Sequence, residues 1–438
     1  MKNINLILVF VLAPILLLGQ SKSIDSLKVV IASQQNDSTK VESLLELSKL
    51  YYDSDPSEAI KISEEATKLG REIGYLRGAA YGLKNAGIAF YYQGNYIEAI
   101  SHWKRALAVF DTIGDKQGVA NILSNIGAVY YAQGDYNNAI DHHLRSLSVA
   151  EEIQDTIRIV TSLLNIGVVY LDKPITYNKA LDYSLKALKL SEMIGYDEAI
   201  ATSSVNIGEI YYNAGDYDKA LTNYQKAKDA MQGADGSIDV MASIGKAYTK
   251  KGQYSDAVLI LQESIELANQ LNSQPNKAHA LVALAETYNL IGKRSEAIKA
   301  YQVARNIATE IKSLKILEQI FQGLNQLYSE RGTYDSAYKY QHLLLNIKDS
   351  IYNAETEEIL NNQMFNFQIE KKQNEINLLT KDKELQELDF QKQRVIRNLI
   401  GAGLISVMIF LIVVMSQKKR ISKEKERSEE LLLNILPK

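Results

Sequence analysis

The sequence of 438 residues contains no cysteine, only 5 prolines and 1 tryptophan. The absence of cysteine excludes disulfides, thiolate nucleophiles and thiolate metal sites. The scarcity of proline, together with abundant Ala, Leu, Ile, Lys and Glu, favours helix along nearly the whole chain. The formal net charge of −3 differs from the strongly basic balance that is typical of nucleic-acid-binding proteins, so we expect no nucleic-acid partner.

The sequence also lacks the motifs of common catalytic sites. It contains no His-Glu-x-x-His, P-loop or Gly-x-Ser-x-Gly. His142 and His143 are neighbours in a predicted helix, so their side chains diverge and are poorly placed to share a metal ion. His143 occupies a position that Trp103 and Tyr224 fill elsewhere in the chain, which indicates packing. We therefore expect no catalytic residue, no metal site and no cofactor in this chain.

A short sequence motif recurs along the chain. It consists of glycine, a polar residue and tyrosine, and it occurs at 94–96, 134–136, 215–217 and 252–254. Alanine follows each tyrosine by three residues and is itself followed by an aliphatic residue. The full alanine series is Ala59, Ala99, Ala139, Ala180, Ala220, Ala257, Ala297 and Ala337. A nearly constant period of about 40 residues indicates stacked units, each of which needs neighbours to bury its apolar face.

The unit of residues 123–150 illustrates the fold that we predict for each repeat. One face of a first helix is formed by residues at helical spacing, namely Leu123, Ile126, Gly127 and Tyr130. Gly134 ends that helix, because glycine tolerates the backbone angles of a tight turn. Ala139 then lets a second helix approach closely. This pattern of small residues and tyrosines resembles the tetratricopeptide repeat in its 40-residue variety, over roughly residues 40–350. The resemblance implies an all-α fold, a solenoid of about eight helix pairs.

The far side of each first helix remains free to bind a partner. Helical geometry turns Asn125 away from the second helix, and equivalent amides and tyrosines recur in other units. The candidate groove residues are Asn85, Asn125, Asn165, Asn206, Tyr91, Tyr131 and Tyr212. Side-chain amides can pair with an extended peptide backbone, and tyrosines add apolar area with a polar tip. In tetratricopeptide proteins this side lines a concave groove, so the resemblance implies a peptide or protein ligand. The alternative is that the asparagines hold adjoining repeats together.

Two apolar segments flank the repeats. Residues 1–20 combine a basic start, a short apolar run and small polar residues, which predicts a signal peptide, with an uncleaved anchor as the alternative. Residues 398–417 carry no charge and would span about 30 Å as a helix, which predicts one transmembrane helix. Basic residues are more numerous after this helix than before it. Residues 418–438 should therefore be cytoplasmic and the repeats, within 21–350, extracytoplasmic or periplasmic, on a single-pass protein of the inner membrane.

Residues 351–397 are expected to form a coiled-coil helix between the repeats and the membrane. Their aliphatic side chains follow two displaced heptad seams, as at a stutter. The seams are formed by Ile369, Ile376 and Leu379, and by Leu378, Leu385, Leu388 and Val395. Asn398, Ala402 and Ser406 share one face of the transmembrane helix, as in close helix–helix contacts in lipid. We expect a homodimer; a solitary helix packed on the solenoid is the alternative.

The last eleven residues, 428–438, change from charged helix to a leucine-rich stretch closed by Pro437. This phrase resembles the linker that stands immediately before class III adenylate or guanylate cyclase domains in bacterial membrane receptors. The resemblance implies the receptor part of a cyclase, whose catalytic domain is absent here, so we expect no enzyme activity from this chain. The alternatives are the sensor part of a histidine kinase, or an envelope scaffold that does not signal.

Overall fold

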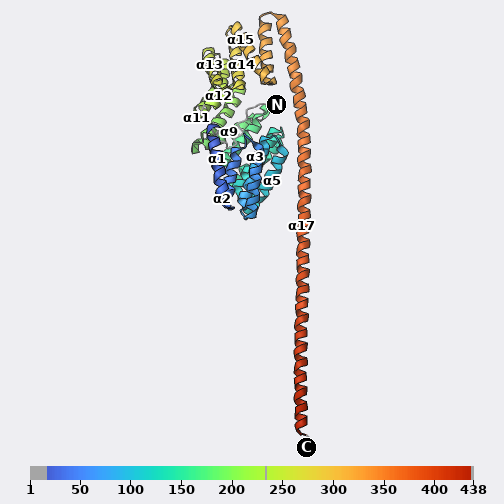
Figure 1. Cartoon of the computed structure of the whole chain (residues 1–438). Helices are drawn as coiled ribbons and strands as arrows, with labels where there is room; N and C mark the ends of the chain where they lie inside the picture. The colour runs from blue at the N-terminus through green and yellow to red at the C-terminus, as the bar shows by residue number, and fades with distance from the viewer. Residues whose placement is uncertain (1–16, 232–233, 436–438) are drawn as a thin grey trace. The chain divides into compact units, whose positions relative to one another are not determined.

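The computed structural model describes residues 17–231 and 234–435, and helices make up almost all of them (Figure 1). No strand occurs in these residues, so the predicted all-α class is confirmed. In chain order the elements are α1 (Leu17–Ser33), α2 (Ser38–Leu50), α3 (Pro56–Glu72), α4 (Leu76–Tyr92), α5 (Tyr96–Ile113), α6 (Lys116–Ala132), α7 (Tyr136–Glu152), α8 (Thr156–Leu171), the 3-10 helix η1 (Pro174–Thr176), α9 (Tyr177–Ile194), α10 (Asp197–Asn213), α11 (Tyr217–Ala230), α12 (Ala234–Lys251), α13 (Tyr254–Gln270), α14 (Gln274–Leu290), α15 (Arg294–Glu310), α16 (Leu314–Glu330) and α17 (Tyr334–Ile435).

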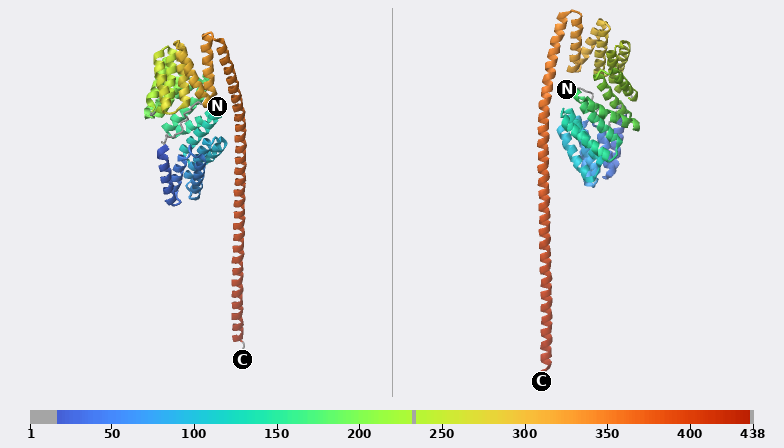
Figure 2. Two further views of the ribbon diagram at one scale, coloured as in Figure 1. Left: turned by 45° about the horizontal axis from the view of Figure 1, so that its top comes forward. Right: turned by 180° about the vertical axis from the view of Figure 1, so that it is seen from behind.

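The chain divides into two units, with the division after Asn366. In the first unit, helices α2 to α16 and the start of α17 form eight helix pairs, and successive pairs lie side by side (Figure 2). The even-numbered helix of each pair is its first helix and the odd-numbered helix its second. The repeat period therefore corresponds to one antiparallel helix pair, as predicted.

Local signals in the sequence place the turns inside the repeats. In the third repeat Gly134 has φ of 70°, a left-handed conformation that glycine adopts without steric cost. Asp135 follows as the N-cap of α7, where its side chain accepts a hydrogen bond from the backbone N–H of Asn138 at 3.1 Å. Such a cap satisfies one of the free N–H groups at a helix start. The fourth repeat differs, because Pro174 there begins η1 instead.

The repeat alanines and glycines set the distance between the two helices of a pair. All eight alanines of the series are buried, at 0–6% exposure. A Cβ at Gly87 would lie 2.3 Å from Nε1 of Trp103, and one at Gly127 would lie 2.7 Å from Cε1 of His143. Glycine is thus required where a large side chain of the second helix lies against the first. His143 is buried against Gly127, in the place that Trp103 occupies in the second repeat.

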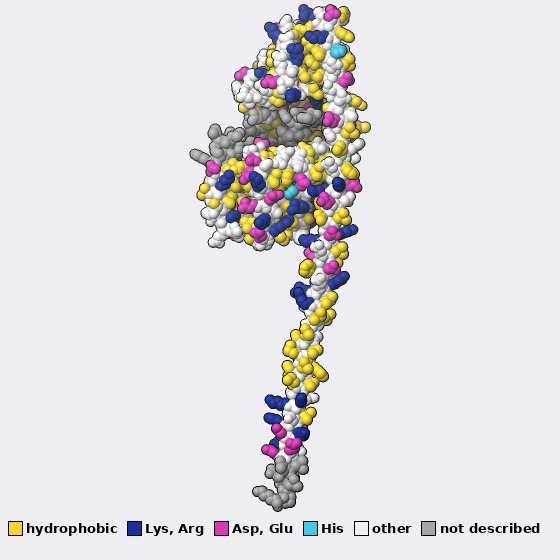
Figure 3. Space-filling view, turned by 45° about the vertical axis from the view of Figure 1, so that its right-hand side comes forward, with side chains coloured by type: hydrophobic (Ala, Val, Ile, Leu, Met, Phe, Trp, Pro, Cys, Tyr) yellow, Lys and Arg dark blue, Asp and Glu magenta, His cyan; other side chains and the backbone are white. Residues whose placement is uncertain are grey.

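Helix α17 continues without interruption from Tyr334 to Ile435, so the predicted boundaries at 350, 397 and 417 all fall inside it. Among the described residues, α17 is the one helix whose length and composition would allow it to cross a membrane. Figure 3 shows hydrophobic side chains covering part of this helix, with lysine and arginine side chains on either side. Residues 1–16 of the predicted signal peptide and residues 436–438 of the predicted linker lie outside the described residues.

Candidate functional site

A cavity of about 460 Å³ lies on the first-helix side of four consecutive repeats. Side chains of α2, α4, α6 and α8 line it, with Tyr52 added from the turn after α2 and Ser146 from α7. The lining residues include amides, hydroxyls and three cations beside apolar side chains, but no described acidic residue. The cavity therefore lies on the side of the first helices that the sequence predicts to be free. No cluster of three or more acidic or histidine side chains suited to a metal ion occurs in the described part of the chain.

Two of the four predicted asparagines join adjoining repeats. Asn85 lines the cavity but is only 1% exposed. Its Nδ2 donates to the carbonyl of Leu45 at 3.2 Å and to Oγ of Ser48 at 2.9 Å, both in the first repeat. Asn165 donates from Nδ2 to Oγ of Ser124, one repeat earlier, at 3.1 Å. Both side chains thus make the inter-repeat contacts that the sequence left open as an alternative.

The other two asparagines differ from this pair. Asn125 is half-buried at the cavity wall, and its side chain makes no hydrogen bond to another described residue. Asn206 is buried in α10, outside the cavity lining, with an unpaired Nδ2. Of the predicted amides, Asn125 is therefore the one whose donor and acceptor face the cavity unpaired in the described structure.

The three predicted tyrosines lie at the ends of the first helices, near the turns, and do not line the cavity. Each ring lies against the tyrosine that opens the following helix, with centroid distances of 5.4–5.8 Å. The pairs are Tyr91 with Tyr96, Tyr131 with Tyr136, and Tyr212 with Tyr217. Burial raises the pKa of each of the three predicted tyrosines to about 12. Their part in ligand binding stays a prediction.

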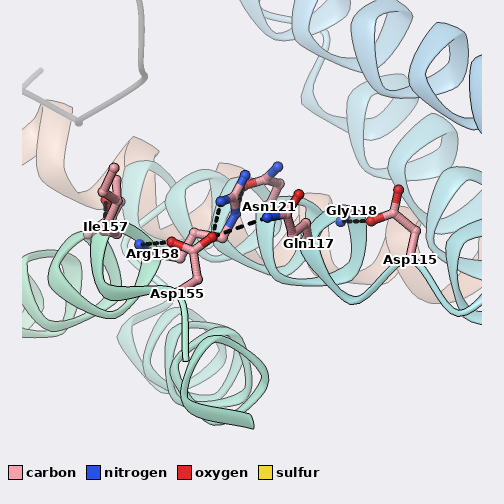
Figure 4. A network of polar contacts seen from close by, with 8 residues as sticks. Asp115, Gln117, Gly118, Asn121, Asp155, Ile157 and Arg158 are labelled. Atoms are coloured by element: carbon pink, nitrogen blue, oxygen red, sulfur yellow. Dashed lines mark hydrogen bonds and ion pairs between the residues drawn. The ribbon is translucent and has the colours of Figure 1, made fainter. Parts of the chain in front are cut away.

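The cations of the cavity are residues that the sequence analysis missed. Arg158 of α8 forms an ion pair with Asp155 and donates from Nε to Oδ1 of Asn121 at 3.0 Å (Figure 4). Lys49 of α2 pairs with Glu46 at 2.5 Å.

Lys84, one residue before Asn85 on α4, has no acidic partner in the described structure; its Nζ lies 5.2 Å from the centre of the Tyr81 ring. Burial, with the charges of Lys49 and Arg158, lowers the pKa of Lys84 to about 8.

Residues 359–366 of α17 contact the third repeat within the same unit. Nδ2 of Asn366 donates to Oδ2 of Asp135 at 3.0 Å, so the N-cap of α7 also binds α17. Phe365 is buried, and its ring lies edge-on to Tyr130 with centroids 6.3 Å apart. A second cavity, of about 360 Å³, lies between the α6–α7 turn and residues 359–366. The third repeat therefore contributes both to the wall of the first cavity and to the contact with residues 359–366 of α17.

The sequence profile described as Tetratricopeptide repeat matches the chain in five overlapping windows, at residues 76–152, 118–193, 158–233, 197–270 and 236–310. Together these windows cover more than half of the chain. The chain belongs to the tetratricopeptide-repeat family. This confirms the resemblance drawn from the glycine, alanine and tyrosine pattern. No curated protein sequence matches this tetratricopeptide-repeat protein.

Solved structures share the fold at low sequence identity. The apo form of the quorum sensor NprR from B. thuringiensis aligns with a TM-score of 0.57 and 16% identity, over 75% of this chain and 93% of that one. A Rap protein complexed with competence and sporulation factor aligns with a TM-score of 0.51 and 18% identity, over 77% of this chain and 97% of that one. The STAND protein with a tetratricopeptide repeat sensor from Pyrococcus horikoshii aligns with a TM-score of 0.53 and 16% identity, over 78% of this chain and 52% of that one. These likenesses establish a tetratricopeptide-repeat solenoid.

The contrast between Asn85 and Asn125 leads to a first prediction. Asn85→Ala is expected to lower the free energy of unfolding by about 1–2 kcal/mol, because it removes two buried hydrogen bonds between repeats. Asn125→Ala should change it by less than about 0.5 kcal/mol, since its amide has no described partner. Urea unfolding followed by circular dichroism measures both. Equal losses in the two variants would contradict the distinction between a structural amide at Asn85 and an unpaired one at Asn125.

Proposed function

We propose that the chain is the receptor part of a membrane-anchored sensor whose solenoid binds an extended peptide or protein segment in the cavity of α2, α4, α6 and α8. The observation that carries the proposal is the amide of Asn125 in the wall of this cavity, which is unpaired in the described structure. A side-chain amide offers both a donor and an acceptor, as an extended backbone requires. The shared fold with the quorum sensor and with the Rap protein solved in complex with competence and sporulation factor supports a ligand-binding role for the solenoid.

The membrane part of the proposal rests on α17. Residues 398–417 are uncharged, and their hydrophobic side chains are exposed. A stretch of this length and composition matches the hydrocarbon core of a bilayer. The excess of Lys and Arg after residue 417 favours a cytoplasmic C-terminal segment, and the proposed signal peptide at 1–20 would place the repeats on the other side. We therefore place the protein as a single-pass protein of the cytoplasmic membrane, with its repeats extracytoplasmic.

The signalling part requires that ligand binding alter the packing of α17. Leu378, Leu385, Leu388 and Val395 are 53–64% exposed, so the proposed coiled-coil seam is open to a second copy of the chain. Asn366 and Phe365 contact the third repeat, so a change in the solenoid can act directly on the position of this helix. A ligand shifts such an equilibrium only if it prefers one packing, and a coupling of about 1–3 kcal/mol suffices for regulation. The resemblance of residues 428–438 favours a nucleotide cyclase as the effector.

The absence of cysteine allows a clean test of this topology. Ser295→Cys places one thiol on the exposed surface of α15, and Ser428→Cys places one near the end of α17. A membrane-impermeant maleimide added to intact spheroplasts should label the first variant and leave the second unlabelled until the membrane is permeabilised. The unsubstituted chain, which has no thiol, is the control. Labelling of position 428 but not 295 in intact spheroplasts would show that the proposed orientation is wrong.

A further inference from the structure

We infer that the first part of α17, residues 334–364, pairs in parallel with the same part of a second copy of the chain. The inference goes beyond the proposed function, in which only the seam of residues 378–395 is open to a second copy. It adds an interface at the C-terminal end of the solenoid itself, and this interface does not depend on a ligand in the cavity.

The first step compares the last repeat with the seven before it. The residue after each repeat alanine is buried or half-buried in the earlier repeats, whereas its equivalent Tyr338 is 74% exposed. The earlier residues are Ile60, Ile100, Ile140, Leu181, Leu221, Val258 and Ile298. Tyr334, which opens α17, is also 74% exposed, although the tyrosines that open α5, α7, α9, α11 and α13 are half-buried. The last repeat therefore exposes an aromatic face that the other repeats cover.

The second step identifies what covers this face in the other repeats. Leu221 packs in a core cluster with Ile244 of α12, and Ile298 packs in one with Ile320 of α16. In each case the covering helix is the first helix of the next repeat. No ninth pair follows α17 among the described residues. Terminal repeats of a solenoid need a polar outer face to remain soluble, so the apolar face of α17 is suited to accept one more helix.

The third step is the spacing of the exposed apolar side chains along α17. Tyr338, Leu345, Tyr352 and Ile359 follow one another at steps of seven residues and are 51–74% exposed. A seven-residue apolar repeat is the seam of a left-handed coiled coil, and a seam of this kind packs against a helix with the same repeat. The spacing therefore indicates a partner helix that lies along α17.

The other side of α17 is occupied by the chain's own repeats. Tyr340 and Leu344 belong to the core cluster of the last repeats, and the ring of Phe365 lies against Tyr130 of the third. These side chains are set about half a turn away from the exposed stripe. Two copies can therefore meet along the stripe with their solenoids on opposite sides of the paired helices.

The fourth step selects a second copy as the partner. The exposed stripe continues through Leu360 and Phe367 to Leu378, where the proposed seam begins, at steps of 7 and 11 residues. These steps are about two and three helical turns, so the side chains stay on one side of the helix. A parallel second copy brings the identical spacing, stutter included, over the whole length. The proposed membrane span would hold the two copies parallel.

The exposed area is sufficient for a specific contact. A covered aromatic side chain buries about 150–250 Å², so Tyr334, Tyr338 and Tyr352 of two copies offer roughly 600–1,000 Å² at their exposure of 69–74%. The exposed parts of Leu345 and Leu360 carry the total past the roughly 1,000 Å² that a specific interface requires.

Cysteine crosslinking of the full chain in native membranes tests the pairing, because the unsubstituted chain has no thiol. Leu345→Cys and Tyr352→Cys should form disulfide-linked dimers on mild oxidation, since each seam residue lies beside its counterpart in a parallel pair. Ser350→Cys is the matched control, because Ser350 is also exposed but lies about 160° around the helix from Tyr352. Dimers should form about tenfold faster at positions 345 and 352 than at 350. Leu385→Cys reports separately on the proposed coiled-coil seam.

The four positions distinguish the inference from the proposed function. Crosslinking at 345 and 352 that is no faster than at 350 overturns the inference. If only Leu385→Cys then forms dimers, the copies pair in the proposed seam alone and the proposed function still stands. If none of the variants crosslinks, the homodimer of the proposed function falls together with the inference, and the exposed stripe is left to a different protein.

Charge substitutions provide a second measurement, on the full chain in detergent micelles. Leu345→Glu and Leu345→Lys each place like charges opposite each other, so each is expected to raise the dissociation constant of the dimer about 10–100-fold. A mixture of the two variants should recover most of the affinity, because opposite charges then face each other. Ser350→Glu is the control and should leave the constant unchanged.

Analytical ultracentrifugation measures these dissociation constants. Leu345 is 51% exposed in the single chain, so neither substitution should alter its folding, which circular dichroism checks. Dissociation constants equal to that of the wild type in both single variants would contradict the inference. No recovery in the mixture would equally contradict it, since Leu345 would then not face its own counterpart.

Discussion

Trp103→Ala is expected to lower the free energy of unfolding by about 3–5 kcal/mol, the usual cost of truncating a buried aromatic side chain. Trp103 is the only tryptophan of the chain and is fully buried. Its Nε1 donates to the backbone carbonyl of Lys84 at 3.0 Å, and its ring fills the space that Gly87 leaves open. The substitution therefore removes both the packing of the indole against Gly87 and a hydrogen bond beneath the proposed binding cavity. Urea unfolding of the full chain in detergent, followed by circular dichroism, measures the loss.

A double-mutant cycle with Gly87 tests the cause of that loss. In the wild type, Gly87→Ala puts a Cβ about where the indole lies, 2.3 Å from Nε1, and should destabilise by about 1–3 kcal/mol. With Trp103→Ala in place the clash disappears, and alanine is a better helix former than glycine by about 1 kcal/mol. The effect of Gly87→Ala is thus expected to reverse sign. An equal loss in both backgrounds would mean that the close approach of Gly87 to Trp103 is not what specifies the helix pair.

The repeat architecture could be predicted because its signals are local. The alanine series alone gave the period, and all eight of these alanines are buried in the structure. The Gly134-Asp135 turn also follows from short-range rules, since glycine supplies the left-handed backbone and aspartate the N-cap. The boundaries inside α17 could not be placed in the same way. Residues 355–397 contain no glycine or proline, so no residue marks where the last repeat ends along the continuous helix.

The roles of the asparagines depend on their neighbours in the preceding repeat. Asn85 meets Ser48, which stands 37 residues earlier and accepts its hydrogen bond. At the same offset from Asn125 stands Ile88, whose side chain has no acceptor. The two amides occupy equivalent positions in the repeat, so the pattern alone does not distinguish a structural amide from an unpaired one. That distinction requires knowing which side chains face each other across the stack.

The cations of the cavity were missed for a related reason. Lys49, Lys84 and Arg158 lie in three different repeats and follow no common repeat position. Only the stacking of α2, α4, α6 and α8 brings them to one cavity. A signal was present for Lys84, because it adjoins a predicted groove asparagine. No sequence pattern indicated that this lysine would lack an acidic partner among the described residues.

Acidification is expected to destabilise the third repeat through His143. Burial, and to a lesser extent the charge of His142, lowers the pKa of His143 from 6.5 to about 3. Between these two values the unfolded chain binds a proton at this residue and the folded chain does not. Stability therefore falls as the pH decreases from 6.5 toward 3, and the contribution is constant above 6.5. One pKa unit corresponds to 1.36 kcal/mol, so we expect a loss of about 2–3 kcal/mol between pH 7 and pH 4.5.

His143→Leu is the matched variant for this test. Leu261 fills the equivalent position against Gly245 in another repeat, so leucine suits the site. Nδ1 of His143 is buried without a hydrogen-bond partner in the described structure, so the change removes no bond at that nitrogen. The variant should equal or exceed the wild type in stability at pH 7 and lose less of it at pH 4.5. His279, whose pKa burial lowers to about 4, is present in both proteins and cancels in the difference.

Trp103 provides the readout for this comparison. It lies in the repeat next to His143 and is the only tryptophan, so its fluorescence follows unfolding of this part of the solenoid alone. The difference between wild type and His143→Leu in unfolding free energy should grow steadily as the pH falls below 6.5. Burial by itself is enough to set the sign of this pH dependence. Protonation of His143 would place a charged imidazolium in the packed site against Gly127, away from water, which disfavours the folded state. If the difference between the two proteins is the same at pH 4.5 as at pH 7, protonation of His143 is not coupled to unfolding of its repeat.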